Sequence, residues 1–270
     1  MSNSYHDTKA GRLSVETHGS GPPIFFWPSL FLDRSIFTSQ IAHFSRSYHV
    51  VAVDGPGHGE SGKSVSNLTI EDCADAVEEI LTNLGIRRAS FIGASWGGLV
   101  GIAVATKYPE LVDRLAIIGS PLAAPDRWER LQGGILLILY SLFGGRERMM
   151  RTLLSQGIGS EFRRARSNDF DALVRRLARV PHRRRLPAMR AVMLERQDML
   201  SCLAQLQIPV MLIRGKDDAF LSVEQFARQA AALPAAAVRV IPGSGHLPSL
   251  EKGEETTAVL VDLLRGSQDS

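Results

Sequence analysis

The chain has 270 residues, of which 44% are hydrophobic and 22% are charged, and its formal net charge is +3. This length fits a single α/β domain with an insertion, and the composition is ordinary for a soluble globular protein with a large core. Residues 1–11 are polar, so they hold no apolar segment of a signal peptide. Two cysteines exclude a disulfide framework, and we expect free thiols in a cytoplasmic protein.

Apolar stretches of strand length alternate with longer helical patterns over most of the chain. This alternation predicts an α/β fold with a mostly parallel sheet that helices cover on both faces. Thr69 with Asp72 three residues on has the pattern of a helix N-cap, so we expect a helix to begin at residue 70. The predicted strands are 13–18, 24–27, 49–54, 89–94, 115–119, 210–215 and 238–242. The predicted helices are 35–44, 70–84, 96–107, 222–233 and 254–265.

The strand signal stops between residues 120 and 208, where the pattern is helical with glycine and proline breaks. Residues 126–190 hold 15 arginines, no lysine and six acidic residues, which gives a local charge balance of +9. A basic patch can bind nucleic acid or an anionic ligand. These arginines, however, alternate with apolar residues at helical spacing, which is typical of a solvated helix face. We therefore expect no nucleic-acid partner.

The most informative motif is Gly93-Ala94-Ser95-Trp96-Gly97, at the junction of a predicted strand and a predicted helix. In such a turn the serine takes strained backbone angles that small neighbours permit, and its hydroxyl is lifted out of the sheet. The turn also aims the Trp96 backbone N–H at an oxygen that becomes negative during attack. The motif therefore predicts Ser95 as a nucleophile.

A serine nucleophile needs a base, and the base needs an acid that orients it. Asp217 and Asp218 follow the predicted strand 210–215, at the edge of a parallel sheet where ligand sites form. His246 follows the predicted strand 238–242 in a glycine-rich loop, and of seven histidines it alone comes after the acid-bearing strand. The order Ser, Asp, His predicts a catalytic triad in which either carboxylate could be the acid.

These motifs resemble those of the α/β-hydrolase family, and the resemblance covers nearly the whole chain. Residues 93–98 are similar to the nucleophile elbow, 215–218 to the G-x-x-D acid loop, 245–246 to the G-H base loop and 54–61 to the D-x-P-G-x-G-x-S turn. The family's acid comes three residues after its glycine, which implies Asp218. The resemblance also implies a core domain of residues 1–120 and 201–270, with a helical cap at 121–200.

The second oxyanion-hole donor follows from the same resemblance. Many members carry His-Gly after an early strand, and the next backbone N–H stabilises the oxyanion. Here Pro28-Ser29 takes that place, which implies Leu30 as the donor beside Trp96. A shift of one residue in the alignment would move the role to Ser29 or to Phe31, so these alternatives stay open.

The family resemblance to serine esterases and enol-lactonases implies a carboxylic ester hydrolase that needs no cofactor and no metal. Its partner would be a small-molecule ester or lactone. An apolar acyl pocket under the cap is one role for the large apolar side chains of the insertion, and a packed cap interior is the other. The candidate pocket residues are Leu136, Leu139, Phe143, Met150, Met189 and Met193.

Other functions fit the same motifs. A lactonase, a carbon–carbon bond hydrolase of ring-cleavage products or a cofactor-free perhydrolase would use the same triad, and an arginine-rich cap suits a substrate carboxylate. A non-catalytic ligand receptor on this fold is a function of a different class. Turnover of a substrate would distinguish an enzyme from such a receptor. The longest apolar run, residues 135–140, is far shorter than the roughly 20 residues of a membrane span, so we expect no membrane partner. The oligomeric state stays open.

Overall fold

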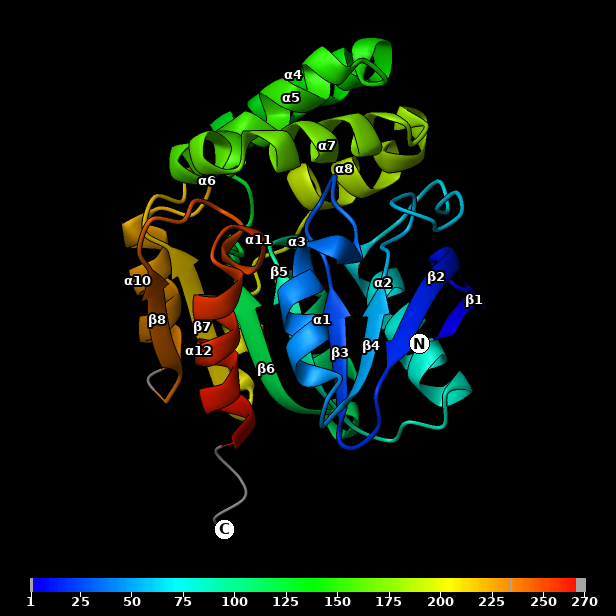
Figure 1. Cartoon of the computed structure of the whole chain (residues 1–270), viewed down its shortest axis with the longest axis vertical. Coiled ribbons are helices and arrows are strands. Elements are labelled where there is room, and N and C mark those ends of the chain that lie inside the picture. Colours follow the sequence, from blue (N-terminus) through cyan, green and yellow to red (C-terminus); the bar gives the residue numbers. More distant parts are fainter. Residues whose placement is uncertain (1, 234, 266–270) are drawn as a thin grey trace.

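The computed structural model describes residues 2–233 and 235–265. Its centre is an eight-stranded sheet in the order β1-β2-β4-β3-β5-β6-β7-β8 (Figure 1). Strands β3 to β8 are parallel, whereas β2 pairs antiparallel with both β1 and β4. This architecture confirms the predicted α/β-hydrolase fold class. The strands are β1 (Ser2–Thr8), β2 (Gly11–His18), β3 (Pro23–Trp27), β4 (His49–Val53), β5 (Ala89–Ala94), β6 (Val112–Ile118), β7 (Val210–Gly215) and β8 (Ala237–Ile241).

Strand β1 is the sheet element that the sequence analysis did not predict. It pairs with β2 along its whole length, from Ser2 opposite Thr17 to Thr8 opposite Gly11. Its side chains are polar and at most half-buried on both faces, so it lacks the apolar alternation by which strands are recognised. Backbone pairing at the sheet edge, rather than burial of side chains, therefore holds this strand.

Helices cover both faces of the sheet (Figure 1). On one face α1 (Thr38–Phe44) packs against α12 (Gly253–Arg265), and on the other α2 (Ile70–Asn83) packs against α3 (Trp96–Lys107). These positions confirm the predicted helices to within a few residues. The shorter elements of the core are η1 (Arg34–Phe37), η2 (Pro109–Leu111), α9 (Leu200–Gln205), α10 (Val223–Ala232) and α11 (Pro248–Glu251).

The start of α2 is set by a capping box. The Asp72 backbone N–H donates to Thr69 Oγ1 at 3.0 Å, and the Thr69 N–H donates to the Asp72 carboxylate at 3.0 Å. Two of the backbone donors that a helix N-terminus leaves unpaired are satisfied in this way. The predicted N-cap is therefore confirmed.

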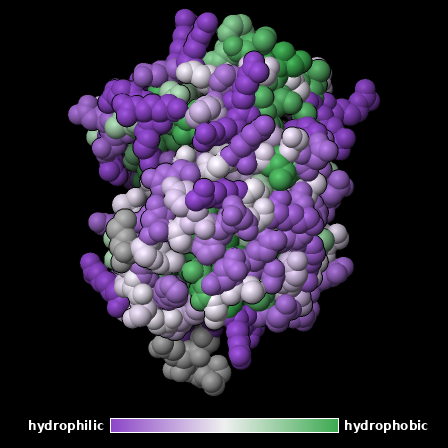
Figure 2. All heavy atoms as spheres, turned by 90° about the vertical axis from the view of Figure 1, so that its right-hand side faces the viewer, coloured by the Kyte–Doolittle hydropathy of each residue, from purple (hydrophilic) through white to green (hydrophobic). Residues whose placement is uncertain are grey.

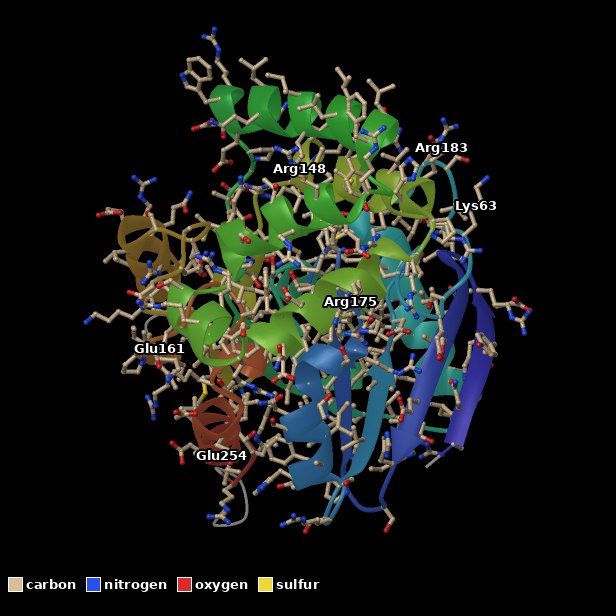
Figure 3. The ribbon with its side chains drawn as sticks, turned by 45° about the horizontal axis from the view of Figure 1, so that its top comes forward. Lys63, Arg148, Glu161, Arg175, Arg183 and Glu254 are labelled. Atoms are coloured by element: carbon tan, nitrogen blue, oxygen red, sulfur yellow. The ribbon has the colours of Figure 1, made fainter. Side chains whose placement is uncertain are left out.

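Most of the helices between β6 and β7 form a layer over the carboxyl ends of the strands, and we call this layer the cap (Figure 1). Arg148, Arg175 and Arg183, labelled in Figure 3, are three of its exposed arginines. Because parallel strands end at this edge, the cap covers the place where the loops with the predicted site residues meet. Its elements are α4 (Arg127–Phe143), α5 (Glu147–Gly157), α6 (Ser160–Ala165), α7 (Ser167–Ala178), η3 (His182–Arg185) and α8 (Leu186–Met193).

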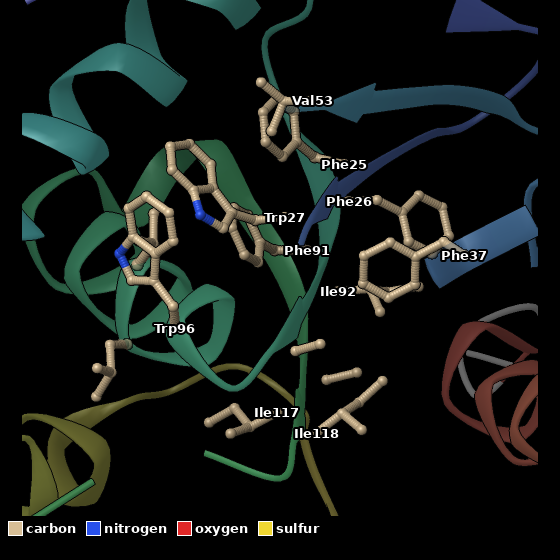
Figure 4. Close-up of a cluster of buried hydrophobic side chains, with 14 of the residues drawn as sticks. Phe25, Phe26, Trp27, Phe37, Val53, Phe91, Ile92, Trp96, Ile117 and Ile118 are labelled. Carbon is tan, nitrogen blue, oxygen red and sulfur yellow. The ribbon is translucent and has the colours of Figure 1, made fainter. Parts of the chain in front are cut away.

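A cluster of buried aromatic side chains joins β3, β5 and α3 (Figure 4). The rings of Trp27 and Trp96 meet edge to face at 5.5 Å, and Phe25 stacks on Phe91 at 5.4 Å. All four side chains are at most 1% exposed. Large aromatic rings packed in this way contribute much of the burial energy and hold the strand ends rigidly.

Over residues 2–233 and 235–265, none of the helices combines the length with the apolarity that a membrane span requires.

Candidate active site

Ser95 lies between the last residue of β5 and the first residue of α3. Its backbone angles are φ 51° and ψ −106°, in a region that L-residues rarely adopt. A Cβ at Gly97 would lie 2.2 Å from the carbonyl oxygen of Trp27, so the first turn of α3 can approach β3 only with glycine at that position. The turn leaves the Ser95 side chain half-buried at the carboxyl edge of the sheet.

Gly119 connects Ser95 to the two other predicted site residues. The Ser95 N–H donates to the carbonyl oxygen of Ile118 at 2.7 Å, which places Gly119 beside Ser95 on neighbouring parallel strands. A Cβ at Gly119 would lie 3.4 Å from both Asp218 Oδ2 and His246 Nδ1, and its φ of +64° also favours glycine. The structure therefore brings Ser95, Asp218 and His246 together around this position.

The carboxylate of Asp218 faces the ring of His246. Both carboxylate oxygens lie 3.0 Å from Nδ1, and Asp218 Oδ1 also accepts the N–H groups of Phe220 and Leu221. Burial opposes ionisation of Asp218, but His246 and the two N–H donors more than offset it, so the pKa of Asp218 lies below its ordinary value. Asp217 is exposed, and its N–H donates to a carbonyl oxygen. Of the two carboxylates, Asp218 is the one in contact with the histidine.

The His246 loop is attached to the cap. The His246 N–H donates to the carbonyl oxygen of Gly157, the last residue of α5, at 2.8 Å. Phe220 packs edge to face on the imidazole with the ring centres 4.9 Å apart. The backbone bond fixes the loop, and the Phe220 contact limits rotation of the imidazole, which suits a group that must keep one orientation.

Glu251 joins the same loop to the cap a second time. Its buried carboxylate accepts the backbone N–H groups of Gly245, Leu247 and Gly159 at 2.8, 3.0 and 2.9 Å. Two of these donors flank His246, and the third lies at the start of α6. Burial raises the pKa of Glu251, although the three N–H bonds oppose the shift.

The backbone donors predicted for an oxyanion hole come from two turns, one after β5 and one after β3. Trp96 is the first residue of α3, where a helix leaves its N–H groups without intrahelical acceptors. Leu30 lies in the turn after β3, and within the described part of the chain its N–H donates no hydrogen bond. The Phe31 N–H is engaged, because it donates to His58 Nε2 at 3.0 Å. Of the two alternatives to Leu30, Ser29 stays open and Phe31 does not.

His58 determines the shape of this turn. Its Nδ1 lies 2.9 Å from the Pro56 carbonyl oxygen, so Nδ1–H donates there and the unprotonated Nε2 accepts from Phe31, whose φ is 70°. Complete burial, together with the nearby Arg185 guanidinium, lowers the pKa of His58 to about 3. The neutral ring therefore holds Phe31, and with it the adjacent Leu30, in one conformation.

The residues expected to line an acyl pocket fall into two groups. Leu139 and Phe143 lie on the outer side of α4 and are 42% and 40% exposed. We correct the expectation for these two, because they point away from the rest; hydropathy alone does not report which side of a helix packs inward. The buried or partly buried members are Leu136, Met150, Met189 and Met193.

Clusters of metal-ligating side chains and cavities are the other places where a ligand could be held. In the described ranges, 2–233 and 235–265, there is no group of three or more His, Cys, Asp or Glu side chains that could hold a metal ion. A cavity of about 660 Å³ opens beside α1 and beneath α7, and neither Ser95 nor His246 lines it. Its charged wall is internally paired, since Arg34 bonds Asp54 at 2.6 Å and Glu60 at 2.8 Å.

Sequence reasoning missed Gly119, His58 and Glu251. His58 lies inside the D-x-P-G-x-G-x-S turn, so the turn motif was a signal for it, although its contact with Phe31 was not readable. Glu251 follows His246 by five residues and carries no signal of its own. Gly119 directly follows a predicted strand, where glycine is common, and only the packing shows why it is needed.

Comparison with known proteins agrees with this geometry. A family model described as "Alpha/beta hydrolase family" matches residues 17–259. A 2-hydroxy-6-oxononadienedioate/2-hydroxy-6-oxononatrienedioate hydrolase of Paraburkholderia phymatum is 27% identical, over 96% of this chain and 90% of its own length. Among solved structures, a thermophilic esterase from Thermogutta terrifontis has a TM-score of 0.90 at 23% identity, and the match covers 98% of each chain.

The enol-lactonase from Burkholderia xenovorans has a TM-score of 0.87 at 21% identity, over 97% of this chain and 99% of its own. At such identities the structural likeness establishes the fold and no more. The family match, in contrast, spans the nucleophile turn, the acid loop and the base loop described above. The chain is therefore a member of the alpha/beta hydrolase family, and its resemblance to that family's motifs reflects membership.

Proposed function

We propose that this chain is a serine hydrolase that cleaves carboxylic esters of small or medium-sized molecules through an acyl-enzyme. The observation that carries the proposal is the contact of Asp218 with His246 Nδ1, around the glycine that adjoins Ser95. An ionised carboxylate only accepts hydrogen bonds, so Nδ1 must donate to it. His246 Nε2 then has a free lone pair with which to take the Ser95 proton.

The reaction would run in two halves. Ser95 Oγ attacks the ester carbonyl carbon while His246 Nε2 takes its proton, and the carbonyl oxygen becomes negative. The N–H groups of Trp96 and Leu30 would stabilise that oxygen, and loss of one such donor typically costs roughly 3–4 kcal/mol in the transition state. His246 next protonates the leaving alcohol, and the acyl group remains on Ser95. Water attacks the acyl carbon, His246 accepts its proton, and Ser95 is restored as the acid leaves.

The cap, for which we keep the expected range of residues 121–200, would select the substrate. Its pocket residues in this proposal are Leu136, Met150, Met189 and Met193, which lie buried or partly buried in the cap. Methionine side chains adapt to ligands of different shape, so this composition favours a range of acyl groups over one defined group.

A second candidate is cleavage of a lactone or of a carbon–carbon bond by the same three residues. It is supported by the match to 2-hydroxy-6-oxononadienedioate/2-hydroxy-6-oxononatrienedioate hydrolases, which extends over 96% of this chain. A lactone is an internal ester, so its opening needs no new chemistry. In carbon–carbon cleavage the leaving atom is carbon, and the proton that His246 delivers would have to end on that carbon.

The test is hydrolysis of p-nitrophenyl esters of increasing acyl length, with Ser95→Ala beside the wild type. We expect prompt turnover that falls at least about 10⁴-fold in the variant, because the nucleophile is lost while folding is kept. The acyl length that is hydrolysed fastest would indicate the size of the acyl pocket. Absence of turnover by the folded wild type would reject the ester proposal. If the folded protein then turns over lactones or ring-cleavage acids, the second candidate is assigned. If it turns over none of these compounds, a non-catalytic ligand receptor is favoured.

A further inference from the structure

Helix α4 presents a continuous apolar face to solvent. Trp128, Leu131, Ile135, Ile138 and Leu142 recur at intervals of three and four residues, which places them on one side of the helix. Seven of the thirteen exposed large apolar side chains among the described residues lie on this helix. Figure 2 shows this hydrophobic area at the top of the molecule, with hydrophilic side chains around it. We call it the α4 face.

The rest of α4 is packed into the cap, so the helix cannot turn its apolar face inward. Gly133 and Tyr140 are buried, and Leu136 and Leu137 pack against the core. From the exposed fractions, the α4 face leaves on the order of 700 Å² of apolar side chain in water, more than the few hundred Å² usual for the largest patch of a monomer. A patch of this size marks an interaction surface.

Arginines flank both ends of this face. Arg127 and Arg130 lie in the first turn of α4, and Arg146 and Arg148 follow its last turn; all four are exposed. The segment 126–190 carries a balance of +9, so the remainder of the chain carries −6 against the total of +3. The charge of the whole molecule is therefore polarised toward the side that bears the α4 face.

Three acidic residues offset part of this charge, so the four arginines at the two ends of α4 leave a local excess of one positive charge. Asp126 and Glu129 form the capping box of α4, and Glu129 also pairs with Arg196 at 3.0 Å. Glu147, in the first turn of α5, is the third acid of this stretch. Within residues 128–143 the one acidic residue is Glu129, and the exposed polar residues are Arg130 and Gln132.

We propose that the α4 face docks on the surface of an anionic lipid bilayer. An apolar arc that ends in tryptophan and phenylalanine and is flanked by arginines has the composition of a helix that lies in the membrane interface. Apolar contact and a basic surface are two separate contributions, and stable peripheral binding needs both. A second copy of this chain suits the α4 face less well, because two segments that each carry a charge of +9 would then face and repel each other.

Docking of this kind differs from the expectation of no membrane partner. That expectation considered only the length of apolar sequence needed to span a bilayer. A helix that lies on the surface needs only one apolar side, and α4 has 17 residues with that side outward. The inference does not depend on the proposed hydrolysis, since binding to lipid needs no turnover. Ser95→Ala should therefore bind vesicles as the wild type does, whatever its activity.

The test is flotation of the full chain with vesicles of phosphatidylcholine alone, or of phosphatidylcholine mixed equally with phosphatidylglycerol. We expect flotation with the mixed vesicles at low salt, and much less with the neutral vesicles or at high salt. Ile135→Gln with Ile138→Gln, which are 50% and 62% exposed, should lower the partition coefficient at least roughly tenfold. Arg127→Gln with Arg148→Gln should lower it by a similar factor, roughly fivefold for each arginine.

Matched controls remove the same groups elsewhere. Val223→Gln with Val240→Gln replaces side chains that are 62% and 49% exposed in α10 and β8. Arg87→Gln with Arg88→Gln replaces an exposed pair before β5, at the opposite edge of the sheet from the cap. Both control pairs should float like the wild type.

Three outcomes would overturn the proposal: a wild type that does not float with anionic vesicles, flotation that the α4 substitutions leave unchanged, or equal losses in the control pairs. Sedimentation equilibrium of the same proteins completes the test. A dimer that dissociates on Ile135→Gln with Ile138→Gln would assign the α4 face to a second copy and reject the bilayer.

Discussion

The Nε2 atom of His58 accepts the backbone N–H of Phe31 at 3.0 Å, so a histidine in the turn after β4 holds the turn after β3. The neighbouring Leu30 N–H donates no hydrogen bond to any residue that the structure describes. His58→Gln keeps an acceptor, whereas His58→Ala leaves the N–H of the half-buried Phe31 unpaired. We expect His58→Ala to lose roughly 1–3 kcal/mol of stability and His58→Gln to lose less. Denaturant unfolding of the two variants measures the difference. Equal losses would mean that the hydrogen bond is not what holds the turn.

The pH dependence of stability provides a second test of His58. Its folded pKa of about 3 lies below the ordinary 6.5. Below pH 6.5 the unfolded chain binds a proton that the folded chain rejects, so this contribution to stability is complete above 6.5 and is lost as the pH falls toward 3. The loss should approach about 1.4 kcal/mol per pH unit. Urea unfolding at a series of pH values should show this slope in the wild type and a shallower slope in His58→Gln. If the stabilities of the wild type and of His58→Gln changed with pH in parallel, the slope would not come from His58.

Asp218 and Asp217 form a natural control pair, because they are adjacent carboxylates of which one contacts His246 and the other is exposed. Asp218→Asn should lower kcat roughly 10⁴-fold, since an amide can hold the wrong imidazole tautomer. Asp217→Asn should stay within a factor of a few. Steady-state kinetics on the best ester distinguishes the two variants. Similar activities in both would remove Asp218 from the mechanism.

Gly119→Ala tests whether the space between Ser95 and His246 matters. The added Cβ would lie 2.8 Å from the carbonyl oxygen of His246. Gly85→Ala is the matched control, because its φ of +69° is similar to the +64° of Gly119 and nothing lies within 4 Å of its Cβ position. Both should lose roughly 1–2 kcal/mol of stability from backbone strain. Only Gly119→Ala should also lower kcat, by up to about 10²-fold, as expected for a displaced catalytic group. Equal kcat values for Gly119→Ala and Gly85→Ala would show that the added Cβ at position 119 does not disturb the function of the His246 loop.

Glu251→Gln should weaken the anchoring of the His246 loop. The amide places an NH₂ group against backbone donors that the carboxylate now accepts, so one or more of the three bonds is lost. We expect a loss of roughly 2–4 kcal/mol in stability and a lower kcat at unchanged KM. Glu254→Gln, at an exposed position labelled in Figure 3, is the control and should change neither quantity. A fall in stability without any change in kcat would restrict Glu251 to a structural role.

Much of the fold could be predicted from the sequence because the central strands are apolar runs bounded by turn residues. The range predicted for β5 and that predicted for β7 coincide with the observed strands. Strand β1 could not be predicted, since backbone pairing rather than an apolar pattern holds it. The cytoplasmic location and the division into core and cap stay predictions.

The candidate site could be proposed from the sequence where chemistry restricts residue type and spacing, as at Ser95 and His246, whose catalytic roles stay predictions. The choice between Asp217 and Asp218 needed either the family pattern or the structure, because both carboxylates follow the same strand. Contacts between distant segments, such as Glu251 with Gly159, have no signature in a single sequence. Nor does hydropathy tell the inner from the outer side of α4, which is why Leu139 was expected in the pocket.

The two bonds that join the cap to the histidine loop, from His246 to Gly157 and from Gly159 to Glu251, limit how this enzyme could be engineered. A chimaera that receives a foreign cap would have to keep residues 157–159 together with the loop at 245–251, or the proposed base, His246, would lose its support. The cap helices before residue 157, in contrast, could be exchanged more freely. Substitutions meant to change the substrate range should therefore be made in α4 and the first turns of α5, because these parts of the cap make neither of the two bonds to the His246 loop.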